Sequence, residues 1–172
     1  MDRYVGKNRV VVTGIGIITP IGIGVDAFWE SAIHGKSGIS MISRFNVESY
    51  PTKIAGEIKN FHPEKYMPGD LADALCRYSQ LGLAAAQMAV RDANLELNSL
   101  NKNKVGISIG VGAETLLYYD EKTAIENNKY TLRIKPPVEN RNIANVISDY
   151  FHFSGQNLVV ATACSSGNQA IG

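Results

Sequence analysis

The sequence predicts an α/β layered fold. Two apolar segments rich in β-branched residues, 9–16 and 104–112, each end in glycines, and segments of helical periodicity lie between them. A third apolar run, Leu158–Ala161, leads directly into a cysteine, two serines and a glycine. Uniformly apolar strands that are separated by helices are typical of a parallel sheet with helices packed on it.

The composition is that of a globular protein and excludes two classes of partner. Hydrophobic residues make up 45% of the 172 residues, and charged residues make up 19%. Lysine and arginine number 17 against 16 acidic residues, so the net charge is +1. A nucleic-acid binder or a protein that binds an acidic membrane surface would need a basic excess. We therefore expect neither nucleic acid nor membrane as a partner.

The apolar runs and the cysteines indicate a cytoplasmic protein. The longest apolar runs fall far short of the roughly 20 residues that span a bilayer. Residues 1–7 lack the apolar core of a signal peptide. The two cysteines, Cys76 and Cys164, are too few for a disulfide framework, which fits a reducing compartment.

The first apolar segment, 9–16, predicts a strand buried on both faces, because it contains the three consecutive valines Val10–Val12. It ends at Gly14 and Gly16, and a dinucleotide-binding loop is one possible interpretation. Thr19 stands where the third glycine of that fingerprint belongs, and no helix follows directly. We favour the simpler interpretation, in which the glycines permit close packing at the end of the strand.

A helix is predicted to begin at Asp26, which is a good N-cap, and to stop at Gly35. Phe28 and Trp29 are expected to face a core. His34 falls at the helix end, where a cationic group suits the dipole, and is expected at the surface.

Loops and short extended pieces are predicted for residues 36–69, where prolines and glycines are frequent. His62 precedes a proline there and is expected to be exposed. A long helix is predicted over Leu71–Asp92, and its small residues, Gly82 and Ala84–Ala86, form a narrow face suited to tight packing. Cys76 lies in the middle of this helix as a small core residue.

Two more helices are predicted, over residues 114–127 and 142–153, with an irregular segment at 130–138 between them. The last helix carries an apolar face and ends near His152. This histidine could act as a general base for Cys164. We favour a structural role instead, in which the His152 ring is partly buried at the end of the helix. Three scattered histidines and two distant cysteines do not form a zinc site. The apolar face of the last helix consists of Ile143, Val146, Ile147 and Tyr150.

Cys164 is the strongest candidate for chemistry. It stands at the corner between the third apolar strand and a following helix, where unpaired N–H groups and the helix dipole favour a thiolate. Its neighbours Ala163, Ser165, Ser166 and Gly167 are small, so a substrate could approach the sulfur closely. The residues alone predict a reactive thiol and leave its purpose open.

Ordered segments along the chain resemble the N-terminal part of the β-ketoacyl-acyl carrier protein synthases, and they are most similar to the type II elongating class. The resemblance covers nearly all of residues 9–172. The segments that carry it are 10–16 with 19–22, 35–39, 45–56 and the nucleophile motif at 161–167.

The resemblance implies a thiolase-like fold, in which two similar α/β halves form a layered αβαβα sandwich, usually in a homodimer. Residues 1–172 are then expected to be an incomplete N-terminal synthase domain that ends just after the nucleophile. Cys164 matches the active-site cysteine of the family, which receives an acyl group as a thioester. The family then decarboxylates malonyl-acyl carrier protein, and the carbanion attacks the acyl-cysteine to give a 3-oxoacyl product. The resemblance implies an acyl carrier protein as partner and no cofactor.

The chain departs from the family pattern at its histidines. None of His34, His62 and His152 falls in a matching motif, and the two catalytic histidines of the family belong to its second half. We therefore expect that these residues alone do not condense substrates and that half a fold leaves one side of a buried sheet uncovered, as an exposed apolar patch. A coenzyme A-dependent thiolase-type enzyme and a non-catalytic pairing subunit remain as alternatives.

Overall fold

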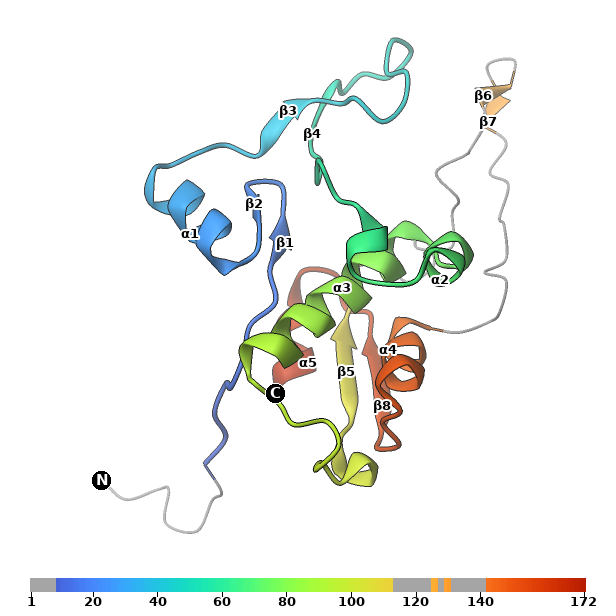
Figure 1. Cartoon of the computed structure of the whole chain (residues 1–172). Coiled ribbons are helices and arrows are strands. Elements are labelled where there is room, and N and C mark those ends of the chain that lie inside the picture. Colours follow the sequence, from blue (N-terminus) through green and yellow to red (C-terminus); the bar gives the residue numbers. More distant parts are fainter. Residues whose placement is uncertain (1–8, 113–124, 127–128, 131–141) are drawn as a thin grey trace.

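The computed structural model describes residues 9–112, 125–126, 129–130 and 142–172, and it shows a mixed α/β arrangement (Figure 1). A parallel pair of strands lies at its centre. β5 (Ile107–Gly110) pairs with β8 (Asn157–Val160), with Ile107 opposite Asn157 and Gly110 opposite Val160. The strands predicted in 104–112 and 158–161 are therefore confirmed, but they are not the buried strands that their apolar runs predict, since part of each strand is exposed.

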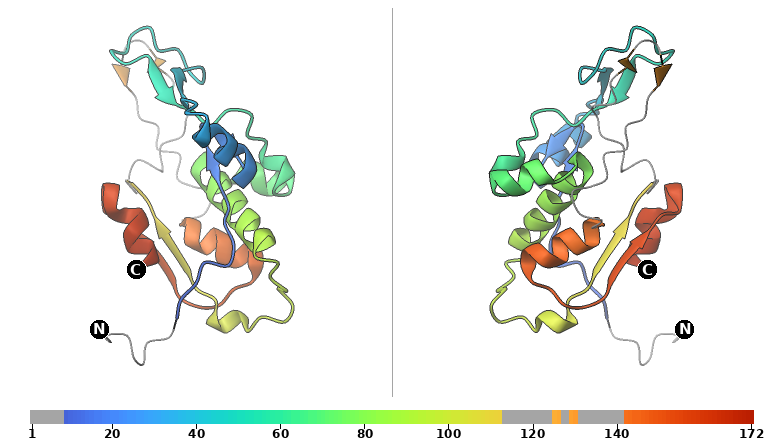
Figure 2. Two further views of the ribbon diagram at one scale, coloured as in Figure 1. Left: turned by 90° about the vertical axis from the view of Figure 1, so that its left-hand side faces the viewer. Right: turned by 90° about the vertical axis from the view of Figure 1, so that its right-hand side faces the viewer.

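Helices cover both faces of this pair (Figure 2). α5 (Ser166–Ile171) lies on one face, while α4 (Ile143–Phe151) lies on the other with α3 (Arg77–Asp92) packed beside it. α4 confirms the helix predicted over 142–153, and the side chain of Asn142 caps it by accepting the N–H of Asn145 at 2.9 Å. The fold is thus layered around the parallel pair, as the sequence predicts.

The hydrophobic core lies between the parallel pair and the two helices α3 and α4. Leu83 of α3 is completely buried, and Ile107 and Ile109 of β5 pack against the cluster. The apolar face predicted for α4 is confirmed at three of its four positions, and Tyr150 is partly buried at the edge of the core. The buried residues of the core are Phe61, Met67, Ala72, Leu83, Ala84, Ile143, Val146, Ile147, Phe151 and Phe153.

The segment that contains Gly14 and Gly16 lies against the small face of α3. A Cβ atom at Gly16 would overlap the carbonyl oxygen of Ala85, and one at Gly14 would stand 2.6 Å from the backbone nitrogen of Ala93. The N–H of Ile15, between the glycines, donates to Oδ2 of α3 residue Asp92 at 2.8 Å. The glycines therefore serve close packing and not a nucleotide loop, although no strand ends at them.

The strand predicted over 9–16 is wrong. These residues have no strand pairing, and Val10 is 94% exposed. β-Branched residues favour an extended backbone, but a strand also needs a partner. In the described part of the chain, the parallel sheet consists of β5 and β8 alone. A short antiparallel pair follows instead, formed by β1 (Ile18–Thr19) and β2 (Gly22–Ile23).

The first helix, α1 (Val25–Ile33), is present, but its details differ from the prediction. Gly24, with φ 92°, occupies the N-cap position, and Asp26 lies in the first turn, where its charge suits the helix dipole. Phe28 is half-buried, whereas Trp29 is 62% exposed and not in the core, because its side of α1 faces solvent. His34 is exposed, as predicted, with Nδ1 2.8 Å from the carbonyl oxygen of Glu30.

Residues 36–69 are loops with short regular pieces, as predicted. β3 (Ile39–Met41) and β4 (Ile54–Gly56) form an antiparallel ribbon, and a short 3₁₀ turn, η1, spans Pro63–Lys65. His62 is exposed next to this turn, which confirms its predicted place.

The single long helix predicted over Leu71–Asp92 is wrong. The structure divides it into α2 (Gly69–Ala74) and α3, and Leu75 and Cys76 between them have extended backbones with ψ of 141° and 157°. The Gln80 side chain donates from Nε2 to the carbonyl oxygen of Ala72 at 2.7 Å, so this carbonyl near the end of α2 has a hydrogen-bond partner. Cys76 therefore precedes α3 and is only partly buried, instead of lying mid-helix.

The predicted helix over 114–127 and the irregular segment over 130–138 lie mostly outside the described residues. Where the two meet the described part, Ile125–Glu126 forms β6 and pairs antiparallel with β7 (Lys129–Tyr130), so the helix prediction is wrong there. A further 3₁₀ turn, η2, spans Lys102–Lys104 ahead of β5.

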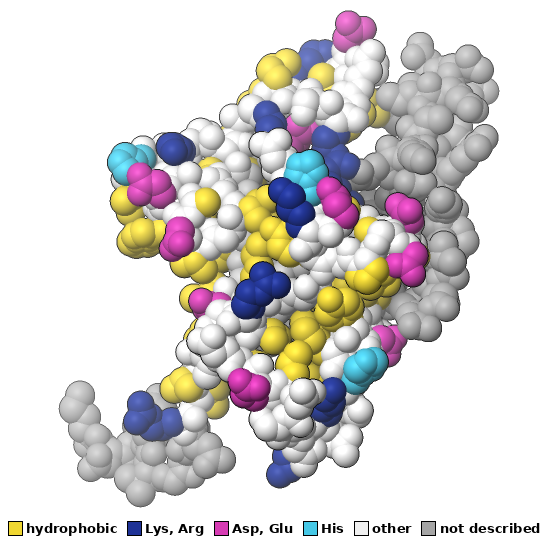
Figure 3. All heavy atoms as spheres, viewed as in Figure 1, with side chains coloured by type: hydrophobic (Ala, Val, Ile, Leu, Met, Phe, Trp, Pro, Cys, Tyr) yellow, Lys and Arg dark blue, Asp and Glu magenta, His cyan; other side chains and the backbone are white. Residues whose placement is uncertain are grey.

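Apolar side chains are exposed at the surface, but they do not form the uncovered side of a sheet that we expected, because helices lie on both faces of the parallel pair (Figure 2). Figure 3 shows them on one face of the molecule, over α1 and between α3 and α4. Leu158 of β8 is more than half exposed, and Ile171 at the end of α5 is almost fully exposed. Among the helices that the structure describes, none combines the length and the apolar character needed to cross a membrane.

Candidate active site

Cys164 lies at the carboxyl end of β8, in the turn that leads to α5. The turn η4 (Ala163–Ser165) is 3₁₀, and the α-helix begins only at Ser166. The Cys164 side chain is exposed. The strand–turn–helix corner is therefore present as predicted, with the thiol in the turn that precedes the helix.

The backbone at the corner is strained. Ala163 has φ 51°, in the left-handed region that side-chain-bearing residues seldom adopt. Such residues persist only where the surrounding structure holds them, and they gather at functional sites. The residue before the thiol is thus held in an unusual conformation.

A network of hydroxyl groups holds this turn. Ser166, only 2% exposed, accepts the N–H of Thr162 at 2.8 Å and donates from Oγ to the carbonyl oxygen of Val111 at 2.6 Å. Ser165 Oγ lies 3.0 Å from the carbonyl oxygen of Thr162. Thr162 Oγ1 in turn lies 3.0 Å from Oε1 of Gln169, one turn into α5.

Gly110, the last residue of β5, permits the close approach of α5. A Cβ atom there would stand 2.5 Å from the carbonyl carbon of Ser166 and 2.7 Å from the nitrogen of Gly167. A Cβ at Gly112 would meet nothing within 4 Å. The sequence marks both glycines only as the end of a strand, and it does not show which of them faces the cysteine turn.

The structure does not bring a histidine to Cys164. His34 ends α1, and His62 pairs locally, with Nδ1 3.2 Å from Oε1 of Glu64. His152 ends α4 and lies before the amino end of β8, whereas Cys164 follows the carboxyl end of that strand. Because α4 and α5 lie on opposite faces of the parallel pair, the alternative role of His152 as base for Cys164 is wrong. Its exposure also differs from the partly buried ring that we favoured.

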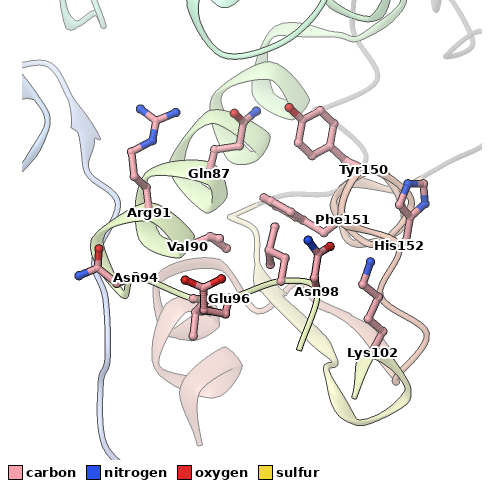
Figure 4. A pocket seen from close by; sticks show the side chains of 12 residues that line it. Gln87, Val90, Arg91, Asn94, Glu96, Asn98, Lys102, Tyr150, Phe151 and His152 are labelled. Carbon is pink, nitrogen blue, oxygen red and sulfur yellow. The ribbon is translucent and has the colours of Figure 1, made fainter. Parts of the chain in front are cut away.

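His152 instead borders a hollow on the α3–α4 side of the molecule (Figure 4). Lys102 and Tyr150 contribute polar groups to its rim, and Val90 and Phe151 contribute apolar surface. Cys164 is not among the residues that line this hollow. The hollow and the thiol therefore belong to different sides of the molecule.

A buried carboxylate lies outside the cysteine turn. Glu57 accepts the backbone N–H of Ser43 and its hydroxyl, each at 2.9 Å, and the N–H of Arg44 at 3.2 Å. The Ser43 backbone hydrogen bond is the main cause that holds the pKa of Glu57 below its usual value. These bonds tie the loop after β3 to the residue after β4, which is a structural role that the sequence does not signal.

Lys59, and Arg77 at the start of α3, are basic neighbours of this carboxylate. The Arg77 guanidinium donates to the carbonyl oxygen of Ile58 at 2.8 Å and lies 5.5 Å from the centre of the Phe61 ring. Burial lowers the pKa of Arg77. Within the described residues, no group of three or more His, Cys, Asp or Glu side chains could hold a metal ion.

Comparison with protein families agrees with this arrangement. The family model described as "Beta-ketoacyl synthase, N-terminal domain" matches residues 7–172. The 3-oxoacyl-[acyl-carrier-protein] synthase 2 of Synechocystis sp. is 34% identical over 170 residues, which cover 96% of this chain and 41% of the relative. The protein of the same name from Vibrio cholerae is 33% identical over 172 residues, with the same coverage of 96% and 41%.

Solved structures resemble the fold as well. A β-ketoacyl synthase from Burkholderia phymatum matches with a TM-score of 0.71 at 20% identity, over 96% of this chain and 42% of that one. A type II polyketide ketosynthase in complex with its acyl-carrier protein (AntDE:AntF) matches with a TM-score of 0.67 at 25% identity, over 96% and 45%. The chain spans about two fifths of the length of the curated relatives that it matches. Since the family model covers almost every residue, this chain belongs to the β-ketoacyl synthase family and corresponds to its N-terminal domain.

Proposed function

We propose that this chain is the N-terminal part of a 3-oxoacyl-[acyl carrier protein] synthase and that Cys164 is its acyl-accepting nucleophile. The observation that carries the proposal is an exposed thiol, in a strained turn between β8 and α5, in a chain of the β-ketoacyl synthase family. The relatives named 3-oxoacyl-[acyl-carrier-protein] synthase 2 support fatty-acid elongation, and the related polyketide ketosynthase leaves polyketide assembly as the other pathway.

The proposed reaction has two steps at the cysteine. The Cys164 thiolate attacks the carbonyl carbon of an acyl thioester, so that a new C–S bond forms and the donor thiol leaves. Malonyl-acyl carrier protein then loses carbon dioxide, and the resulting carbanion attacks the acyl-cysteine. This attack forms the carbon–carbon bond, releases the thiolate and gives 3-oxoacyl-acyl carrier protein. The backbone N–H of Cys164 is one donor that could stabilise the oxyanion of each tetrahedral intermediate.

The partner and assembly follow from the same proposal. The acyl and malonyl groups arrive on the phosphopantetheine arm of an acyl carrier protein, and the related ketosynthase in complex with its carrier protein supports this. We place residues 1–172 in a thiolase-like αβαβα sandwich, in a homodimer. The exposed apolar residues Leu158 and Ile171 support a further protein layer against β8 and α5. Since no histidine of the chain lies at Cys164, the proton-transfer groups come from outside these residues.

Acyl transfer from a radiolabelled or mass-tagged donor tests the nucleophile. The protein is incubated with acyl-acyl carrier protein or with acyl-coenzyme A, and the adduct is located by peptide mass spectrometry. We expect an acyl group on Cys164 that Cys164→Ser abolishes and that Cys76→Ser, as the matched control, retains. Acylation at Cys76 or at neither cysteine would contradict the proposal. A donor preference for acyl-coenzyme A would favour a thiolase-type enzyme instead.

A non-catalytic pairing subunit is the second candidate, and the exposed apolar residues Leu158 and Ile171 are compatible with it. This candidate predicts that Cys164 stays unmodified with every donor, while the chain still associates with a catalytic ketosynthase partner. The acylation experiment therefore separates the two candidates directly.

A further inference from the structure

We propose that Ser166 is a positioning residue for Cys164, and that its buried hydroxyl fixes the turn from which the thiol reacts. The inference rests on the proposed role of Cys164 as nucleophile. It concerns a residue that acts through the backbone of the turn.

The Ser166 hydroxyl joins the ends of both parallel strands to the helix. Thr162 lies two residues beyond β8 and gives its N–H to Ser166 Oγ at 2.8 Å. Val111 directly follows β5, and its carbonyl oxygen receives the hydroxyl proton at 2.6 Å. A serine hydroxyl has a single proton, for which the carbonyl oxygen of Ala163, 2.8 Å away, competes with that of Val111, and one of its lone pairs accepts the Thr162 N–H.

The position of this hydroxyl determines the path of the backbone through Cys164. Thr162 and Ser166 are four residues apart, and the strained Ala163 and the thiol lie between them. The hydrogen bond therefore closes a short ring that contains the nucleophile. Without it, the left-handed conformation of Ala163 loses one of the contacts that hold it.

Burial makes this contact hard to replace. Ser166 is 2% exposed, and Val111 is also buried. If the hydroxyl is removed, the buried Val111 carbonyl loses a partner in a place with little access for water, and the partly buried Thr162 N–H loses its acceptor. The turn must then shift to satisfy these groups, and the Cys164 sulfur shifts with it.

Gly110 of β5, which faces the Ser166 backbone, also supports the positioning role of Ser166. Its missing side chain lets the Ser166 backbone approach β5, because a Cβ would stand 2.5 Å from the Ser166 carbonyl carbon. A methyl group at this position would push Ser166 away from Val111 while leaving the hydroxyl in place.

The test compares the reactivity of the two cysteines in the whole protein. Iodoacetamide labelling of Cys164 relative to Cys76 is followed by peptide mass spectrometry across a pH series, together with the rate of acyl transfer and its KM. We expect Ser166→Ala to slow both reactions at Cys164 by about 10- to 100-fold. The KM for the acyl donor should not change, and Ser166→Thr should restore most of the rate because it keeps the hydroxyl.

The matched control is Ser148→Ala in α4. Ser148 is also buried and donates from Oγ to a backbone carbonyl, that of Phe153, at 2.7 Å. It lies on the opposite side of the parallel pair from α5, so its loss should lower stability without changing the ratio of Cys164 to Cys76 labelling. If Ser166→Ala does not fold, Gly110→Ala tests the same contact, with Gly112→Ala as its control.

The outcomes separate this inference from the proposed function. An unchanged Cys164 to Cys76 ratio in both Ser166→Ala and Gly110→Ala overturns the positioning role. Equal effects of Ser166→Ala and Ser148→Ala on that ratio overturn it as well, because they indicate general loss of stability. If the unmodified protein is not acylated at Cys164, the proposed function fails, while the labelling ratio still tests the role of Ser166.

Discussion

Of the four residues with side chains that have a left-handed φ in the described part of the chain, Ala163 and His152 adopt it for different reasons. Ala163 has φ 51° and lies next to the candidate nucleophile, inside the ring that Ser166 and Thr162 close. His152 has φ 57° and ends α4, at a position where helices commonly place glycine. The strain at Ala163 therefore belongs to the site, and the strain at His152 only ends a helix.

Replacing His152 should consequently stabilise the protein. A left-handed residue with a Cβ costs about 1–2 kcal/mol, and the extra freedom of glycine in the unfolded chain offsets about half of this. We expect His152→Gly to raise the free energy of unfolding by about 0.5–1 kcal/mol in urea denaturation. His152→Ala removes the imidazole but keeps the Cβ, so an equal gain in that variant would show that backbone strain is not the cause.

Glu57 should make stability depend on pH in the acid range. Its pKa is lowered in the folded state, chiefly by the Ser43 backbone N–H, so the unfolded chain binds the proton more tightly. The stabilisation is therefore complete above the unfolded pKa, about 4.3, and is lost as the pH falls through the lower folded pKa. Urea midpoints measured from pH 7 to pH 3 should fall less steeply in Glu57→Gln, which is also less stable at neutral pH. The exposed Glu48→Gln should follow the unmodified protein, and identical curves for Glu57→Gln would contradict the assignment.

At the scale of elements, the small residues of α3 let it pack closely against two neighbours, the N-terminal segment and α4. Gly16 of the N-terminal segment contacts Ala85. Gly82 contacts Ile143 of α4, and a Cβ atom added at Gly82 would stand 3.0 Å from Cδ1 of Ile143. Helix and neighbours approach closely only because these positions lack bulk. The narrow face of α3 thus determines how the N-terminal segment and α4 are arranged around it.

Adding one methyl group to this contact should be destabilising. We expect Gly16→Ala to lower the free energy of unfolding by about 1–3 kcal/mol, because the backbone of Ala85 cannot move aside without shifting α3. Gly69→Ala, in open space at the start of α2, is the matched control and should cause no loss. Thermal or urea denaturation measures both, and equal stability of the two variants would contradict close packing at Gly16.

Local signals predict the elements that depend on local sequence. The periodicity of α4 and the apolar runs of β5 and β8 are sufficient to predict these three elements, because α4 buries one apolar face and the two runs pair with each other as strands. The break at Leu75–Cys76 has no glycine or proline to signal it and depends on the Gln80 side chain reaching Ala72. Residues 9–16 have the composition of a strand, but strand formation needs a partner that no local pattern specifies.

In the candidate site, too, local sequence predicts some features and only the folded structure shows the others. An apolar run followed by small residues and a cysteine predicts the corner at Cys164. The contact of Ser166 with Val111 joins residues 55 positions apart, so it becomes visible only once the ends of β5 and β8 are known to meet. The same holds for Gly110, which resembles Gly112 in sequence and differs from it only in what surrounds it.

At the scale of the whole molecule, the thiol and the histidines are separated by the fold. α5 and the cysteine turn lie on one face of the parallel pair, and α4 with His152 lies on the other (Figure 2). His34 and His62 belong to α1 and to the turn before α2. Acyl transfer to a thiolate needs a nucleophile and an oxyanion donor, whereas decarboxylation and carbon–carbon bond formation need further polar groups at the substrate.

The 172-residue chain should therefore perform the first step and fail at the second. With acyl-acyl carrier protein we expect acyl-Cys164, and with malonyl-acyl carrier protein added we expect neither carbon dioxide release nor 3-oxoacyl product. Mass spectrometry of the carrier-protein products measures both, with a complete 3-oxoacyl-[acyl-carrier-protein] synthase 2 as the positive control. The product should appear when a complementing chain supplies histidines at the cysteine. Formation of 3-oxoacyl product by the chain alone would show that groups within these residues, other than the three histidines, complete the reaction.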